Sequence, residues 1–354
     1  MMKHIRYAIT ALLSLLATAS CDKTIHEYPY EASLTLTVRC TANLEHPAHY
    51  VTVECDSEEG VSYIVRTQNL EHSDTQHTAP TRLRYIVDLY RERQSHSTFV
   101  ERKVLFADID TPAPQAIASF EVSAERYKVL VWCDYVLDDT EESWCYITDD
   151  LLNVRYADVP ILDNNDKEAF SSVASVDLAK YSHACHDQNI VLDMTLERPN
   201  GRYKCIATDA EEFIASDGSM TEDITAVITY VEYVSAGYNV EEQKPNYFEP
   251  TRTYVAKAEI DDSGDMVLCY DYVLVNGKQS NVKLNMTFYR GDVTMDDSGD
   301  IVGDKISQWY GVIAPLKRNM ETIIEGRLLT TSFGSGSVGI DPGFEGEIVI
   351  PWGD

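Results

Sequence analysis

The stretch Tyr127-Lys-Val-Leu-Val-Trp-Cys-Asp-Tyr-Val136 is apolar on both faces for most of its length. It is also rich in β-branched and aromatic residues, a composition that favours a strand covered on both sides. We therefore expect a central strand of a β-sheet at this position. The acidic turn Asp138-Asp-Thr-Glu-Glu142 and the segment 143–148 come next, and together they predict a hairpin with this strand.

Alternating apolar and polar residues extend the strand pattern in both directions. Ser33-Leu-Thr-Leu-Thr-Val-Arg-Cys40 alternates cleanly, which is typical of a strand with one buried face. One helix is expected at 209–215 with Asp209 as its N-cap, and a short helical turn at 166–172. Many short strands with polar turns predict an all-β protein of antiparallel β-sandwiches. Further strands are predicted at 50–55, 61–66, 83–90, 104–107, 190–197, 202–208, 224–234, 253–259, 266–275, 282–289, 322–330 and 346–350.

The length of the chain and one interruption of its strand pattern suggest two domains. The chain has 354 residues, 44% of them hydrophobic, which is enough to bury two cores. Proline and Asn-Gly interrupt the strand pattern at Arg198-Pro-Asn-Gly201. We therefore expect an N-terminal β-sandwich at 34–197 and a C-terminal β-sandwich at 198–354.

The first residues read as an export signal. Lys3 and Arg6 precede a short apolar run, Tyr7-Ala-Ile-Thr-Ala-Leu-Leu-Ser-Leu-Leu-Ala17, which ends in small residues. The run is too short to span a bilayer stably. Residues 1–20 are therefore predicted to form a signal peptide, and residues 21–33 a polar tether of at most about 40 Å.

The cysteine directly after the small residues makes the prediction more specific. Thr18-Ala-Ser-Cys21 is similar to a bacterial lipobox, although Thr18 stands where an aliphatic residue is usual. In this interpretation the signal is cut between Ser20 and Cys21, and Cys21 carries diacylglycerol on its thiol. The alternative is an ordinary secreted protein whose first cysteine happens to fall at the cleavage site.

The net negative charge of the chain limits the classes of partner that it can bind. The chain has 58 acidic and 29 basic residues, and removal of 1–20 leaves 27 basic residues and a formal charge of −31. Such a field repels nucleic acid and anionic lipid headgroups, so neither is an expected partner. No later segment is apolar and long enough to cross a membrane, so we expect membrane attachment only through lipid on Cys21 or through partners.

No residue pattern predicts catalysis, a cofactor or a metal. The cluster His183-Ala-Cys-His-Asp187 has no second ligand pair at matched spacing, so a polar loop is favoured. Asp261-Asp-Ser-Gly-Asp265 and Asp296-Asp-Ser-Gly-Asp300 lack the register of a calcium-binding loop and predict hairpin turns. If Cys21 carries lipid, seven of the eight cysteines remain, and disulfides at Cys40–Cys55 or Cys133–Cys145 stay open possibilities.

Several segments together resemble a family of Bacteroidetes-type lipoproteins related to fimbrillins, including fimbrial anchor subunits. They are Cys21-Asp with Ile25-His-Glu-Tyr-Pro29, then Val129-Leu-Val-Trp-Cys-Asp-Tyr-Val136, Glu197-Arg-Pro199, and Lys317-Arg-Asn-Met-Glu-Thr-Ile-Ile-Glu-Gly-Arg-Leu-Leu-Thr330. The resemblance implies two tandem transthyretin-like β-sandwich domains, an outer-membrane lipid anchor at Cys21, and pili assembled by donation of a strand between subunits. Partners would then be other pilin-like subunits, bound by β-strand addition.

The leading hypothesis is thus a non-enzymatic, lipid-anchored surface protein that serves as a pilus anchor or accessory subunit in adhesion. The alternative is a surface glycan-binding lipoprotein of a nutrient-uptake system, which the 22 tyrosines keep open. An open apolar groove that lacks one strand would favour polymerisation, whereas exposed Tyr and Trp side chains arranged as a flat platform would favour glycan binding.

Overall fold

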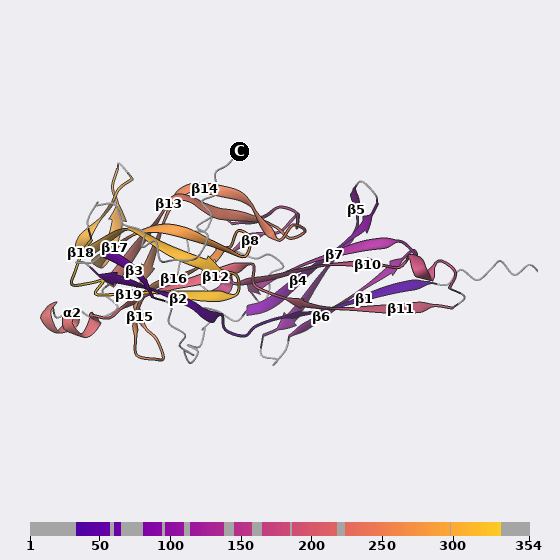
Figure 1. The fold of residues 1–354 in the computed structure, drawn as a ribbon, viewed down its shortest axis with the longest axis horizontal. Coiled ribbons are helices and arrows are strands. Elements are labelled where there is room, and N and C mark those ends of the chain that lie inside the picture. The colour runs from indigo at the N-terminus through magenta and orange to yellow at the C-terminus, as the bar shows by residue number, and fades with distance from the viewer. Residues whose placement is uncertain are drawn as a thin grey trace, which may run out of the picture.

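The computed structural model describes residues 33–56, 60–64, 81–93, 96–109, 114–137, 145–157, 165–184, 186–217, 224–297 and 299–333. These residues form an elongated molecule that is almost entirely β-sheet (Figure 1). Strand β1 (Leu34–Ala42) and the helix α2 (Ala210–Asp217) lie near opposite ends of its long axis. Among the described residues, no helix is long and apolar enough to cross a membrane.

The first sandwich packs a three-stranded sheet, β11-β1-β6, against a four-stranded sheet, β10-β7-β4-β5. β1 pairs in parallel with β11 and antiparallel with β6, and its inward side chains Leu36, Val38 and Cys40 are fully buried. The strands are β4 (Thr81–Glu92), β5 (Ser97–Asp108), β6 (Gln115–Val122), β7 (Arg126–Leu137), β10 (Ala169–Asp177) and β11 (Gln188–Leu196), with 3-10 turns at η1 (Asn165–Lys167) and η2 (Ala179–Tyr181).

The second sandwich is larger and packs two six-stranded sheets, β15-β16-β12-β19-β2-β3 and β18-β17-β13-β9-β8, with β14 paired to β13. Its core includes Trp309, Tyr203 and Phe288, all fully buried. The strands are β2 (Ala48–Asp56), β3 (Gly60–Ile64), β8 (Tyr146–Ile147), β9 (Val154–Tyr156), β12 (Asn200–Ala207), β13 (Ile224–Asn239), β14 (Lys244–Lys257), β15 (Glu259–Ile260), β16 (Met266–Leu274), β17 (Gln279–Met295), β18 (Ile301–Lys317) and β19 (Met320–Gly326).

A third apolar cluster joins the two sandwiches. Trp132 and Leu130 on the outer face of β7 are fully buried against Tyr146, Tyr238 and other side chains of the second sandwich. The Trp132 ring meets the Tyr146 ring edge to face, with centroids 5.1 Å apart. We call this cluster, together with the ion pair below, the junction.

A buried ion pair also crosses the junction. Lys167, between β9 and β10, places its Nζ 2.6 Å from Oδ1 of Asp271 on β16. The Tyr230 hydroxyl donates to Asp271 Oδ2 at 2.6 Å. Burial alone lowers the pKa of Lys167, but Asp271 and the neighbouring tyrosines outweigh burial and raise it. The lysine is therefore held as a cation inside the protein.

The prediction of an all-β protein with antiparallel sheets is confirmed, and β7 is a central strand as its composition indicated. The predicted hairpin is wrong, because β4 and β10 occupy both edges of β7 and Tyr146–Ile147 pairs with β9. The helical turn predicted at 166–172 is a 3-10 turn that ends at Lys167, after which β10 begins.

The domain boundary after residue 197 stays a prediction, and strand pairing crosses it twice. β2 pairs in parallel with β19, and β9 pairs with β13, so both β2 and β9 belong to sheets of the second sandwich. Asp209 precedes α2 as predicted, and its carboxylate accepts hydrogen bonds from the backbone of Leu329 and Thr330.

The predicted hairpin turns at the two Asp-Asp-Ser-Gly-Asp segments are confirmed. Asp261 N–H donates to the Asp265 carbonyl and Asp296 N–H to the Asp300 carbonyl. Each turn has a glycine at positive φ, Gly264 at 86° and Gly299 at 85°, a conformation that favours glycine. The cysteines that the structure describes are buried and form no disulfide, so neither Cys40–Cys55 nor Cys133–Cys145 is bridged; they are 40, 55, 133, 145, 205 and 269.

Candidate functional site

Ser20 and Cys21, the residues predicted for signal cleavage and lipidation, lie outside the described residues. Leu34, the first strand residue after the predicted tether, pairs with Gln188 on β11. Any anchor attached to the tether would therefore lead to the end of the molecule that carries β1 and β11 (Figure 1).

At this end the two sheets of the first sandwich meet along the strands β10 and β11. Among the described residues, β10 pairs along its length only with β7, and β11 only with β1. One isolated bridge joins the two strands: Ser171 N–H donates to the Glu197 carbonyl at 2.9 Å, and Glu197 N–H donates back at 3.2 Å. Beyond the bridge, residues 172–177 and 188–194 form what we call the β10–β11 seam.

Apolar side chains at the seam are only half-buried. Ala174 and Val176 of β10 and Ile190 and Leu192 of β11 pack on the core of the first sandwich, yet each keeps part of its surface in solvent. On β6, at the opposite edge of the same sheet, the inward side chains Ala116, Ala118 and Phe120 are buried, and only Val122 at the strand end is half-buried. The core is thus less completely covered at the seam than at β6.

The edge strands also differ in the residues that protect them against unwanted strand pairing. The edge strand β5 carries Glu101, Arg102 and Lys103, and the Lys103 ammonium lies 5.6 Å from the centroid of the Phe120 ring, on the neighbouring edge of the other sheet. β14 carries prolines at 245 and 250, which cannot donate a ladder hydrogen bond. β10, in contrast, has no charge, glycine or proline before Asp177. Charges and prolines commonly block unwanted strand pairing, and residues 169–176 of β10 lack them.

Charged groups are confined to the rim of the seam. The Asp177 carboxylate accepts a hydrogen bond from Ala179 N–H at 3.0 Å and another from Arg126 Nε at 3.0 Å, and these bonds lower its pKa. Arg39 lies 3.7 Å from Asp193, and both side chains are exposed. The side chains of the seam that face the core are therefore apolar, and its two charged residues are each paired with an arginine.

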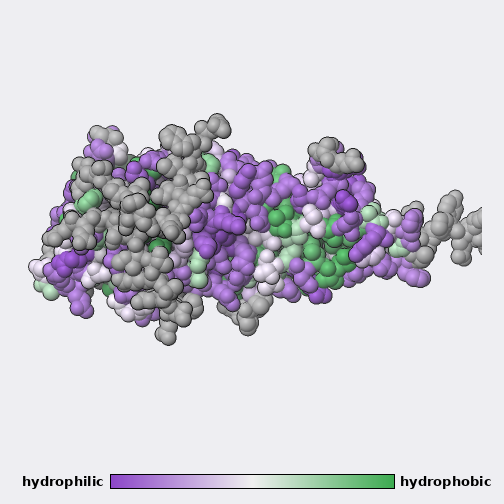
Figure 2. Space-filling view, viewed as in Figure 1, coloured by the Kyte–Doolittle hydropathy of each residue, from purple (hydrophilic) through white to green (hydrophobic). Residues whose placement is uncertain are grey.

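Apolar surface is visible on the half of the molecule formed by the first sandwich (Figure 2). Figure 2 shows hydrophobic surface gathered over the half of the molecule that carries β1, β10 and β11, while most of the remaining coloured surface on this face is hydrophilic. A half-covered core beside a strand edge without protecting charges can accept an extended peptide segment by β-strand addition.

Sequence reasoning found half of this site. The predicted strand at 190–197 contains Ile190 and Leu192, but β10 was missed because Ser171-Ser172 and Ala174-Ser175 blur the alternation of its apolar residues. No local signal in the sequence marks β10, because its pairing with β7 joins residues that lie about 40 positions apart in the chain. Within the described residues no group of three or more His, Cys, Asp or Glu could hold a metal, and Cys185 of the histidine cluster lies outside them.

Comparisons with known proteins give a family and several structures of similar fold. The model of a family of unknown function, DUF6562, matches residues 44–352. A search of the curated proteins finds no match. A candidate adhesin from Bacteroides ovatus is 11% identical, with 83% of this chain and 89% of that chain covered and a TM-score of 0.41.

Two further structures carry fimbrial names. The fimbrial anchor protein Mfa2 from Porphyromonas gingivalis is 10% identical, with 78% of this chain and 82% of that chain covered and a TM-score of 0.34. A fimbrial assembly protein from Parabacteroides distasonis is 6% identical, with 83% and 90% covered and a TM-score of 0.35. These names are of the same kind as the family that the sequence resembles. The family model spans most of the chain, and the chain therefore belongs to the family of unknown function DUF6562.

Proposed function

We propose that this protein is a non-enzymatic, cell-surface lipoprotein of the fimbrillin type, and that it serves as a pilus anchor or accessory subunit in adhesion. It is held in the outer membrane by lipid on Cys21 and accepts an extended segment of a partner subunit at the β10–β11 seam. The observation that carries this proposal is the seam itself, where half-buried apolar side chains lie beside a strand edge without protecting charges.

Backbone geometry supports strand addition to β10. Ser171 N–H points away from β7, because it donates to Glu197. Outward and inward N–H groups alternate along an antiparallel strand, so Val173 and Ser175 also direct their N–H groups to the open side. An added strand would receive hydrogen bonds from these two residues and would cover Ala174 and Val176 with its own apolar side chains.

Proline at position 175 provides a specific test. Ser175 is exposed and its N–H faces outward, so Ser175→Pro removes a donor for the added strand and no hydrogen bond to β7. Ser175→Ala is the matched control, because it also removes the hydroxyl that donates to Glu92 Oε1 at 3.3 Å but keeps the N–H. Surface fibres are sheared from cells that express each form and probed for this chain by immunoblot.

We expect the wild-type chain and Ser175→Ala to co-purify with the fibres, and Ser175→Pro to be lost from them while its circular dichroism spectrum is unchanged. Absence of the wild-type chain from fibres under conditions where fibres form would reject the pilus role. Retention of a folded Ser175→Pro variant would reject β10 as the acceptor edge.

The anchor is tested separately. Cys21→Ala removes the thiol to which lipid would attach, so the protein should move from the membrane fraction to the soluble fraction of the envelope or to the medium. Membrane attachment that is unchanged in Cys21→Ala would show that partners, and not lipid, hold the protein at the membrane.

A further inference from the structure

A second surface feature arises where β13 bends. Tyr230 pairs with Arg252 and Tyr233 pairs with Pro250, so Val231 and Glu232 together oppose the single residue 251 of β14. This arrangement is a β-bulge, and Glu232 has a φ of 78° in the left-handed region, which is uncommon for a residue other than glycine. β-Bulges often lie beside binding sites because they redirect side chains.

The bulge also ends the pairing between β13 and β17. The last pair is Val231 with Lys283, and further along β13 the pairs Gly237–Arg155 and Tyr238–Val154 join it to β9. Beyond the bulge, β13 and the first residues of β17 therefore face each other across a gap whose floor is β16.

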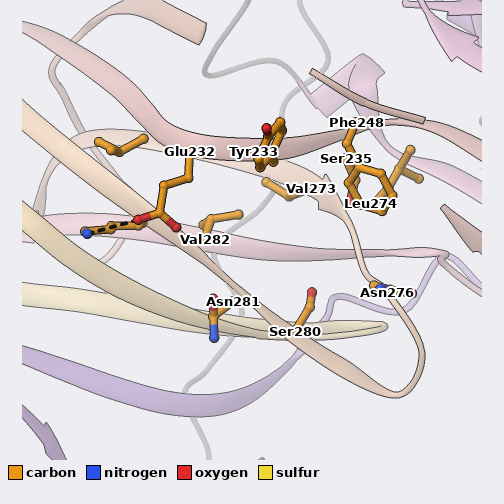
Figure 3. Close-up of a pocket in the computed structure, with 12 residues that line it drawn as sticks. Glu232, Tyr233, Ser235, Phe248, Val273, Leu274, Asn276, Ser280, Asn281 and Val282 are labelled. Carbon is orange, nitrogen blue, oxygen red and sulfur yellow. Dashed lines mark hydrogen bonds and ion pairs between the residues drawn. The ribbon is translucent and has the colours of Figure 1, made fainter. Parts of the chain in front are cut away.

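This gap is a pocket of about 50 Å³. Val273 and Leu274 of β16 form the apolar floor, and Phe248 of β14 lies beside Leu274 (Figure 3). Ser280 and Asn281 of β17 lie on the opposite side from Tyr233, and Asn276 lies at one end. We call this the β13 pocket.

The polar groups of the pocket suit a neutral, hydroxylated ligand. The side chains of Asn276, Ser280 and Asn281 are half-exposed, and none makes a hydrogen bond to another described side chain or backbone group. Lys283 Nζ donates to Glu232 Oε1 at 3.2 Å, so the two charges balance. Amide, hydroxyl and carboxylate groups together can both donate to and accept from ligand hydroxyls.

Tyr233 supplies an apolar surface at the mouth of the pocket. Its side chain is 62% exposed, although it is a large aromatic residue. An exposed aromatic ring with a polar tip binds ligands that have one apolar face and polar edges. A pyranose ring has such a form, because its C–H groups cover a face and its hydroxyls point outward.

We propose that the β13 pocket binds a neutral pyranose unit of a glycan. The ring lies against Tyr233, one exocyclic arm of the sugar enters the pocket, and its hydroxyls bond to Asn276, Asn281 and Glu232. The pocket is too small for a whole sugar ring, so only the exocyclic arm enters it and the ring stays at its mouth. This site lies in the second sandwich and does not depend on strand addition in the first.

Two features separate this ligand class from others. The chain carries 58 acidic and 29 basic residues, a field that disfavours acidic sugars and phosphates. An added peptide strand would need a long free strand edge, but β13 is paired with β14 on one side, and on the other only residues 232–236, between the pairings with β17 and β9, have no partner strand. A neutral sugar meets neither obstacle.

Saturation-transfer NMR on the purified protein tests the proposal. The probes are methyl β-galactoside, methyl β-glucoside, methyl α-mannoside and N-acetylglucosamine, with N-acetylneuraminic acid as the acidic comparison. We expect signal transfer to at least one neutral probe with a Kd on the order of 1 mM, and none to the acidic probe.

Two variants and a matched control locate the binding. Tyr233→Ala and Asn281→Ala should each weaken binding of the neutral probe about tenfold. Tyr247→Ala is the control, because Tyr247 is another exposed tyrosine of the same strand pair that lies outside the pocket, and it should leave the Kd unchanged. No transfer to any neutral probe, or equal binding by wild type and both pocket variants, would overturn the proposal.

Discussion

The junction covers the outer face of β7 between the two sandwiches and the β10–β11 seam lies at an edge of the first sandwich, yet the junction is sealed and the seam is half-open. At the junction, Trp132 and Leu130 are fully buried and a lysine is paired inside the protein. At the seam, Ile190 and Leu192 are half-buried against the core of the first sandwich. Burial stabilises a fold in proportion to the area removed from water, so the difference shows where this chain holds itself together and where it keeps surface for a partner.

The largest expected effect comes from breaking the ion pair at the junction. Asp271→Ala would leave the buried Lys167 cation without its carboxylate and should lower the free energy of unfolding by about 3–5 kcal/mol. Urea denaturation followed by circular dichroism measures this loss. Lys167→Met with Asp271→Leu removes both charges and should recover most of the stability; a double variant as unstable as Asp271→Ala would contradict an electrostatic cause.

Apolar packing at the junction comes next. Leu130 is fully buried, so Leu130→Ala leaves a cavity. The variant should lower the free energy of unfolding by roughly 3 kcal/mol in the same measurement. A loss below about 1 kcal/mol would mean that the junction collapses around the missing side chain, and the contrast with the seam would then fail.

Acid should weaken the second sandwich through Glu321. Burial alone raises the pKa of this carboxyl, but Arg202 and His46 outweigh burial and lower the pKa to about 2 from 4.5. Because the pKa is lower in the folded state, this group stabilises the protein above about pH 4.5, and the contribution is lost as the pH falls towards 2. The resulting loss of unfolding free energy should approach about 3 kcal/mol.

The control is Glu321→Gln, which has no charge to titrate. Its unfolding free energy should be lower than that of the wild type at neutral pH, and the two should converge between pH 4.5 and 2. A constant difference across this range would show that Glu321 does not titrate with a lowered pKa.

Sequence patterns predicted those elements whose environment is uniform. β1 alternates because one face is buried along its whole length, and β7 is apolar for most of its length because both of its faces are covered. β18 was missed because its first half is largely exposed, and its pairing with β17 is interrupted by three register shifts. The sandwich to which β2 belongs could not be predicted, because its partner β19 lies about 270 residues away and pairing at that distance leaves no local pattern.

In the candidate sites, too, some features follow from a local sequence pattern and others do not. Ile190 and Leu192 could be placed on a strand from their alternation, but their incomplete burial depends on how far β10 and β11 separate, which no local pattern records. The β13 pocket depends on a bulge at Val231–Glu232, inside a segment that reads as a continuous apolar strand.

The smallest effect on stability is expected at the seam, and it completes the comparison. Leu192→Ala makes the same chemical change as Leu130→Ala, but at a side chain that keeps part of its surface in solvent. The isolated protein should therefore lose only about 1 kcal/mol on denaturation, because less apolar area returns to water. If an added strand covers Leu192, the same variant should also reduce the amount of this chain recovered with sheared fibres. Equal losses of stability for Leu192→Ala and Leu130→Ala would mean that the seam is already sealed in the isolated protein, and it could not then serve as an acceptor for a partner strand.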